Sequence, residues 1–281
     1  MLIGNYNLHA IETGEFALDG GAMFGIIPKI LWEKKIHADD KNRISLHLRS
    51  LLITGNGKNI LVDDGIGTKD DEKFSSIYKV DHSRFRLESS LAMHNLTCKD
   101  ITDVILTHFH FDHAGGSTML DDHGNIVPTF PNATYYIQQR NLLWAQEPSE
   151  KDQASFTKAN FEPLINRGFL KQLDGPCEIF PLINIIVVEG HTTAQQLVKV
   201  SDGTTTVLYC GDLIPTSAHV PVPWVMGYDN HPITTLNEKK TILEKAASEG
   251  WILFFEHCPI LTACRVVKTS KGFECGEKVD F

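Results

Sequence analysis

The sequence predicts an α/β (α+β) fold in which two similar layers of strands face each other. Short apolar, β-branched runs typical of strands occur in both halves of the chain, and segments with helical spacing follow each set. With 42% hydrophobic and 22% charged residues among 281, the composition is that of a globular protein with a large core. No convincing linker interrupts the chain, so we expect one domain over residues 1–281.

The first predicted elements are a hairpin, a helix and a strand. Residues 46–53 and 60–62 are apolar runs, and Asn56-Gly57 between them is a strong hairpin turn signal. We therefore expect the ordered part of the chain to open with a β-hairpin. Leucines at helical spacing predict a helix over residues 83–95, which leads into a strand over 104–107.

The middle of the chain predicts a second helix and a second set of strands. Residues 134–137 are typical of a strand, and residues 138–145 of a helix that Pro148 keeps from extending. The next forty residues give no clear order. Three strand candidates then predict an antiparallel set, at residues 185–188, 196–200 and 205–209.

The C-terminal part predicts one long helix and a closing strand. Thr235 and Glu238 have the spacing of a capping box, in which the two side chains satisfy amides of the first helical turn. Apolar residues at helical spacing continue from there to Gly250, a typical helix end. Residues 251–255 are then expected to form the closing strand.

The run from His108 to His113 is dense in metal-ligand side chains. His108 and His110 alternate with phenylalanines, so in an extended segment both imidazoles project to one side. Asp112 and His113 follow in a turn that Gly115-Gly116 lets bend tightly. Imidazoles and a carboxylate suit zinc, iron or manganese, and this pattern indicates a metal site rather than a solvated polar loop.

Three further residues follow apolar strands in the second half: His191, Asp212 and His257. Each one alone is typical of a helix cap or a hydrogen-bonded loop residue. Together with the first cluster they become strong candidates for further metal ligands.

At this point the sequence resembles the metallo-β-lactamase superfamily. The family signature H-x-H-x-D-H is present as His108, His110, Asp112 and His113, and residues 61–65 resemble its V-D-x-G element. The later ligands of the family match His191, Asp212 and His257 in order and spacing. The resemblance implies an αββα sandwich, with two mixed β-sheets packed face to face, helices outside and the metals at one edge.

The resemblance also implies a ligand set for two divalent metal ions. One metal would be held by His108, His110 and His191, the other by Asp112, His113 and His257, and Asp212 would bridge them. Zinc is the first expectation, with manganese or iron as alternatives. Asp63 corresponds to a buried family residue that orients a ligand imidazole by hydrogen bonding.

This ligand set implies hydrolysis by a hydroxide that bridges the metals. Two dications, the carboxylates of Asp112 and Asp212, and one hydroxide leave the centre near +1, which favours an anion developing on the substrate. The hydroxide would attack a carbonyl or phosphoryl centre without a covalent intermediate. We assign catalytic roles to Asp212, as the bridge, and to Asp112, as the group that carries a proton to the leaving group.

Two apolar segments are candidates for a substrate lip. Residues 19–32 are interpreted either as a buried strand or as a loop whose Met23, Phe24 and Trp32 line the metal cleft. They resemble the N-terminal segment of the lactonase and organophosphate-hydrolase branch. Residues 215–232 contribute bulky side chains that include Trp224 and Met226, and His219 and His231 flank this loop. Such a lip suits a small, mostly apolar ester, lactone or phosphotriester.

One position departs from the lactonase pattern. Lactonases that open acyl-homoserine lactones carry a tyrosine three residues beyond the bridging aspartate, and Pro215 stands there in this chain. Opening of a lactone ring would therefore have to proceed without a tyrosine at this position. Two alternatives to the leading function are a thioester hydrolase like glyoxalase II and a mononuclear iron oxygenase that acts on persulfides.

The charge, the hydropathy and the cysteine pattern indicate which partners and which cellular location to expect. The net charge of −9 disfavours a broad nucleic-acid surface, and no stretch is long and apolar enough for a membrane span. The start has no signal-peptide pattern, so a cytoplasmic location is expected. The six cysteines contain no CxxC pair and are interpreted as mostly reduced apolar fillers. A small-molecule substrate is expected, and a homodimer is compatible with the sequence.

Overall fold

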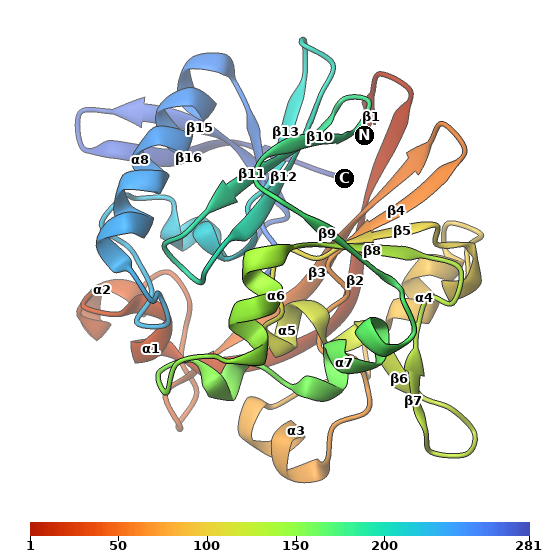
Figure 1. The fold of residues 1–281 in the computed structure, drawn as a ribbon. Coiled ribbons are helices and arrows are strands. Elements are labelled where there is room, and N and C mark those ends of the chain that lie inside the picture. The colour runs from red at the N-terminus through yellow and green to blue at the C-terminus, as the bar shows by residue number, and fades with distance from the viewer.

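The computed structural model describes residues 1–281 and is built on two seven-stranded sheets (Figure 1). Across the first sheet the strands are β1 (Leu2–Ile3), β2 (Tyr6–Asp19), β3 (Arg43–Gly55), β4 (Lys58–Val62), β5 (Asp103–Ile105), β8 (Thr134–Gln138) and β9 (Leu170–Leu173). Across the second they are β10 (Cys177–Phe180), β11 (Ile183–Val188), β12 (Gln195–Ser201), β13 (Thr206–Tyr209), β14 (Ile252–Phe254), β15 (Ala263–Thr269) and β16 (Gly272–Val279).

Both large sheets are mixed. In the first, β4, β5, β8 and β9 run parallel to one another and the other pairs are antiparallel. In the second, only β13 and β14 are parallel. A separate ribbon consists of β6 (Thr118–Leu120) and β7 (Ile126–Pro128).

Eight α-helices and five short 3-10 turns connect the strands. The α-helices are α1 (Gly20–Phe24), α2 (Lys29–Trp32), α3 (Glu72–Tyr78), α4 (Leu87–Ala92), α5 (Phe111–Ala114), α6 (Gln139–Gln146), α7 (Lys158–Asn166) and α8 (Pro232–Glu249). The 3-10 turns are η1 (Cys98–Asp100), η2 (Gly115–Ser117), η3 (Gln153–Ser155), η4 (Gly211–Leu213) and η5 (Ser217–His219).

The buried apolar residues divide into layers that define the sandwich. One cluster joins side chains of β3 and β4, such as Ile53 and Val62, to side chains of β12 and β14, such as Val198 and Phe254, and fills the space between the sheets. Two further clusters lie on the outer faces, beneath α4, α6 and α7 on one side and beneath α8 on the other. Figure 1 shows α8 and α4 on opposite sides of the molecule. The expected αββα arrangement is confirmed.

Most expected elements are present. The hairpin forms as β3 and β4 with Asn56 and Gly57 at positive φ, as a tight two-residue turn requires. The expected helices at 83–95 and 138–145 correspond to α4 and α6, and the antiparallel set in the second half corresponds to β11, β12 and β13.

The start of the chain differs from the expectation. The 14-residue strand β2 precedes the hairpin and pairs with β3 along its length. A bulge between Glu12 and Gly14 interrupts its alternation, and this hides the strand from a period-2 pattern. The segment 19–32 is neither a strand nor a plain loop, because it folds into α1 and α2. The sequence pattern also predicts no helix at residues 72–78, where the structure has α3.

The C-terminal expectations need two corrections. The predicted capping box does not form, because α8 begins one turn earlier with Pro232 in its first turn and Thr235 lies inside the helix. Glu238 instead accepts hydrogen bonds from the backbone amides of Glu189 and Gly190, at 2.7 and 3.1 Å. The strand at 251–255 is not the closing one, since β15 and β16 follow it and complete the sheet. Among the helices of the structure, none combines the length and apolar character that crossing a membrane requires.

Candidate metal centre

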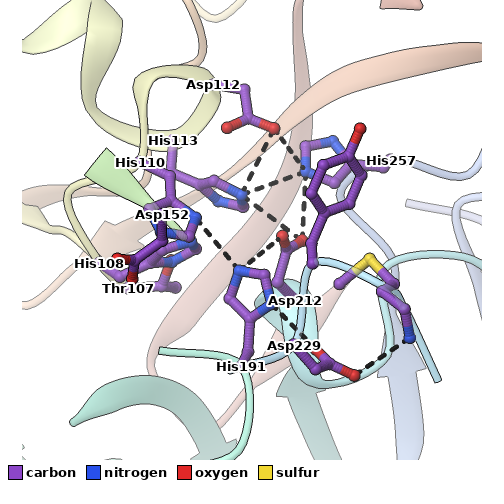
Figure 2. A network of polar contacts seen from close by, with 12 residues as sticks. Thr107, His108, His110, Asp112, His113, Asp152, His191, Asp212, Asp229 and His257 are labelled. Atoms are coloured by element: carbon purple, nitrogen blue, oxygen red, sulfur yellow. Dashed lines mark hydrogen bonds and ion pairs between the residues drawn. The ribbon is translucent and has the colours of Figure 1, made fainter. Parts of the chain in front are cut away.

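The candidate ligands lie at strand ends that meet at one edge of the sandwich. The segment after β5 carries His108 and His110 and continues into the single-turn helix α5, in which Asp112 and His113 are the second and third residues. His191 follows β11, Asp212 lies in η4 after β13, and His257 follows β14. Figure 2 shows these side chains pointing toward one another from the two halves of the chain.

One group of potential ligands consists of His108, His110, His191 and Asp212. Each residue offers one potential ligand atom, and these four atoms all lie within 4.8 Å of one another. The Nε2 of His191 is 3.1 Å from the Nδ1 of His110 and 3.2 Å from the Oδ2 of Asp212. All four residues are buried.

A second group consists of Asp112, His113 and His257, with potential ligand atoms within the same limit. The Nε2 of His257 is 3.2 Å from the Nε2 of His113 and 3.5 Å from the Oδ2 of Asp112. Asp212 reaches this group as well, because its Oδ1 is 3.3 Å from the Nε2 of His257. Its two carboxylate oxygens therefore face different groups (Figure 2).

The donor atoms fit a pair of bound cations. The Nε2 atoms of His108 and His110 are buried and have no hydrogen-bond partner, which is costly for polar atoms unless a ligand satisfies them. Burial, followed by the neighbouring imidazoles, holds the pKa of His108 and His110 well below the usual range. Both rings are therefore neutral, the form in which imidazole binds a metal.

Asp63 contacts one of the candidate ligands, His113, and the neighbouring Thr107. Its Oδ1 accepts from the backbone amide of Thr107 at 2.6 Å, and its Oδ2 lies 3.1 Å from the Nδ1 of His113. The Thr107 hydroxyl also donates to it at 2.7 Å. Asp63 itself has a positive φ of 53°, which the turn after β4 imposes.

Two further carboxylates orient ligand imidazoles and were absent from the sequence prediction. Asp229 places its Oδ1 3.0 Å from the Nδ1 of His191, and Glu256 places its Oε2 2.9 Å from the Nδ1 of His113. Burial raises the pKa of the Glu256 carboxyl to about 7. Such partners fix which nitrogen of the ring faces the metal. Asp229 lies 38 residues from His191 in the chain, and no local pattern connects the two.

A cavity of about 750 Å³, counted to its open mouth, lies directly against the ligands. His110, Asp112, His191, Asp212 and His257 form its floor. Its walls come from β2, α1, α3, α5, the segment before and within η3, and the loop before α8: Leu18, Met23, Tyr78, Phe111, Lys151, Asp152, Ala154, Ser155 and Tyr228.

The predicted lip is only partly at this cavity. Met23 lines it, whereas Phe24 and Trp32 are buried beneath and stack with ring centroids 5.2 Å apart. Met226 is buried too, and Trp224 lines a separate groove. These side chains support the lip from behind because α1 and α2 fold as a small apolar cluster with β3.

The two histidines near the lip do not reach the cavity. His219 is buried, donates from its Nε2–H to the Met23 carbonyl oxygen at 2.8 Å, and stacks on Phe24. His231 is exposed at the start of α8, where its backbone amide donates to Gly190. Tyr78 and Tyr228, from α3 and the loop before α8, supply the aromatic wall that the sequence assigned elsewhere.

The chain is similar in sequence to known metal-dependent hydrolases. Residues 49–257 match the family model described as the metallo-beta-lactamase superfamily. An N-acyl homoserine lactonase from a Bacillus species is 26% identical over 162 residues, which are 57% of this chain and 56% of that protein. The chain thus spans about half the length of this curated relative.

Solved structures share the whole fold. A probable metal-dependent hydrolase from Staphylococcus aureus is 29% identical, with a TM-score of 0.89 over 99% of this chain and 100% of that one. The dizinc quorum-quenching lactonase AidC is 22% identical, with a TM-score of 0.81 over 100% and 97% of the two chains, and shares the fold. Because the family model covers most of the chain, including every candidate ligand, this protein belongs to the metallo-beta-lactamase superfamily.

Proposed function

We propose that the protein is a dinuclear hydrolase of a small, mostly apolar ester, lactone or phosphotriester. The observation that carries this proposal is the position of Asp212, which turns one oxygen to His191 and the other to His257. A single carboxylate shared in this way is what two neighbouring cations require. His108, His110 and His191 would hold one ion, and a second group would hold the other: Asp112, His113 and His257.

The bound ions would supply acidified water and polarisation of a substrate oxygen, with zinc as the first expectation. The chain's own residues then have separate tasks. Asp112 lies at the floor of the cavity with one oxygen near His257, where it can pass a proton to the leaving group. The apolar walls, from Leu18, Met23 and Phe111, exclude water from the reacting centre.

The cavity wall supports a neutral, mostly apolar substrate. Lys151 is the one cationic side chain of the wall outside the histidines, and its Nζ is already bound to the Tyr228 carbonyl oxygen at 2.7 Å and to Asn230 at 3.2 Å. A polyanionic thioester like that of glyoxalase II would need free cations here, so this wall favours esters, lactones and phosphotriesters. The lactonase relative supports the lactone class.

The hydroxyl of Tyr228 is a candidate donor to such a substrate. Burial raises the pKa of this phenol, and nearby Tyr78 and Asp112 raise it further, so the group stays protonated. Pro215 stands three residues beyond Asp212, where the lactonase pattern has a tyrosine, and Tyr228 reaches the cavity from a different position in the chain.

Metal content and turnover measured together test the proposal. The wild-type protein is expected to hold about two metal ions per chain and to hydrolyse members of a panel of lactones, aryl esters, phosphotriesters and thioesters. His108→Ala and Asp212→Ala should lose metal and at least about a thousandfold in kcat/KM, because each removes a buried ligand. His123→Ala, at an exposed position, is the matched control and should retain both.

Two results would contradict the proposal. A metal-free variant with wild-type turnover would show that the ions are not needed. One iron per chain, together with oxygen consumption on a persulfide, would assign the protein to the oxygenase alternative.

A further inference from the structure

Two cysteines on the last hairpin place their sulfur atoms in contact. Cys264 of β15 and Cys275 of β16 have their Sγ atoms 2.6 Å apart. The strand register shifts between Cys264 and Val266, and this bulge brings two side chains that are not direct cross-strand partners together. Both lie on the face of the sheet that packs beneath α8. The sequence interpretation of the six cysteines as mostly reduced apolar fillers does not single out this pair.

The two thiols differ in their chemistry. The Cys264 thiol donates a hydrogen bond to Cys275, which lowers the pKa of Cys275, and the nearby Lys35 ammonium lowers it further. The same hydrogen bond, together with burial, raises the pKa of Cys264. Cys275 is therefore the member of the pair with thiolate character, and thiolates react with oxidants far faster than thiols.

Cys275 is also the member that solvent can reach. It lines an open groove on the surface beside Trp224 and Ile260, with Lys35 at the same groove. Cys264 lies behind it in the core. The remaining buried cysteines, Cys210 and Cys258, line no such groove.

We propose that Cys264 and Cys275 are an oxidation site that a hydroperoxide closes to a disulfide within the folded chain. The Cys275 thiolate attacks one oxygen of hydrogen peroxide, the O–O bond breaks, and a sulfenic acid forms at Cys275. The other oxygen leaves as hydroxide, which takes up the proton given off by the Cys275 thiol and becomes the first water. The Cys264 sulfur, losing its proton, then attacks the sulfenic sulfur, and the sulfenic oxygen leaves as water. In sum, two thiols and one hydrogen peroxide give one disulfide and two water molecules.

The site lies behind the wall of the substrate cavity. The Sγ of Cys275 is 4.0 Å from the carbonyl oxygen of Ser217, the first residue of η5. The last residue of η5, His219, holds the backbone of Met23, which lines the cavity. The dithiol is nevertheless separate from the metal ligands, so this inference does not depend on the proposed hydrolase activity.

Peroxide treatment of the reduced, metal-loaded protein tests the proposal. After treatment, the free thiols are alkylated under denaturing conditions and the protein is mapped by mass spectrometry. The mass of the treated protein is expected to fall by two hydrogens. Four cysteines should be alkylated, where the untreated chain has six. The peptides of Cys264 and Cys275 should be joined by a cross-link that dithiothreitol reverses.

Two variants sharpen the result. Cys177 is the exposed cysteine, so Cys177→Ala is the matched control and should form the same cross-link. Cys264→Ala should form none and should instead leave a sulfenic acid at Cys275 that dimedone traps. Six alkylated thiols after treatment, or oxidation confined to Cys177, would overturn the proposal, and the wild-type map decides this even if Cys264→Ala does not fold.

Discussion

Asp212 and Asp229 show how single carboxylates define the metal centre. Asp212 contacts both groups of candidate ligands, whereas Asp229 contacts His191 on its Nδ1 side. The second oxygen of Asp229 accepts from the backbone amide of Met226 at 3.0 Å. One side chain thus fixes both a ligand imidazole and the loop that carries Tyr228.

Asp229→Asn should weaken metal binding without unfolding the protein. Asparagine is neutral and has one acceptor oxygen instead of two, so it cannot accept from both His191 and the Met226 amide. Loss of such an orienting partner typically costs 10- to 100-fold in metal affinity or activity. Titration of the metal-free variant with zinc, followed by turnover at saturating zinc, measures both effects. Asp122→Asn, at an exposed position, is the control and should match the wild type. Unchanged affinity in Asp229→Asn would assign Asp229 to the loop alone.

His219 makes the stability of the protein depend on pH. Burial lowers its pKa to about 4 from the ordinary 6.5. Between these two values the unfolded chain takes up a proton at this residue that the folded chain does not. The contribution of His219 to the free energy of unfolding is therefore complete above about pH 6.5. It is lost as the pH drops toward 4, and the loss is about 3 kcal/mol in total.

Denaturant unfolding at pH 7 and at pH 4.5 measures this contribution. His219→Gln removes the titrating group, so the difference in unfolding free energy between the two pH values should shrink relative to the wild type. An equal difference in both proteins would place the proton uptake at other residues.

At the scale of the elements, α8 positions the metal centre through Glu238. Its carboxylate accepts from the amides of Glu189 and Gly190, immediately before His191. The sequence assigned this residue to a capping box because Thr235 and Glu238 have the required spacing. The helix begins at Pro232, and Glu238 is left free to hold the neighbouring loop.

Glu238→Ala should destabilise the protein by about 1–3 kcal/mol, because it leaves two backbone donors unsatisfied. Glu244→Ala on the same helix is the matched control. Glu244 forms an exposed ion pair with Lys268 at 2.7 Å, and such pairs contribute about 0–1 kcal/mol. Chemical denaturation of both variants compares the two effects, and equal losses would contradict the role of Glu238 in the His191 loop.

At the scale of the whole molecule, the metal centre joins the two halves of the sandwich. Its ligands come from the segment after β5 of the first sheet and from the ends of β11, β13 and β14 of the second. Bound metal is therefore expected to stabilise the packing of one half against the other as well as the site itself.

Removal of metal should lower the melting temperature. At a free metal concentration of about 100 times Kd, each site that binds only the folded state adds about 2.7 kcal/mol. Without metal, the buried carboxylates and imidazoles also lose their compensating charge. Calorimetry before and after chelation, with zinc and manganese added back, measures the change. If neither chelation nor added metal changed the melting temperature, the prediction that bound metal stabilises the packing of the two halves would be wrong.

The sequence by itself determined the layer architecture and the metal-ligand candidates. Strands and the His108–His113 motif are visible in the sequence because they are short-range patterns: alternation with a period of two, and fixed spacing between neighbouring residues. The positions of His191, Asp212 and His257 at strand ends were readable for the same reason, because each follows an apolar run directly.

Only the tertiary structure decided what surrounds those residues. Asp229 meets His191, Tyr228 enters the cavity in place of Trp224, and Cys264 meets Cys275 across a bulge. These contacts depend on where loops cross and where registers shift. The free energy that fixes them comes from long-range packing and buried hydrogen bonds, which leave no period or spacing in the sequence.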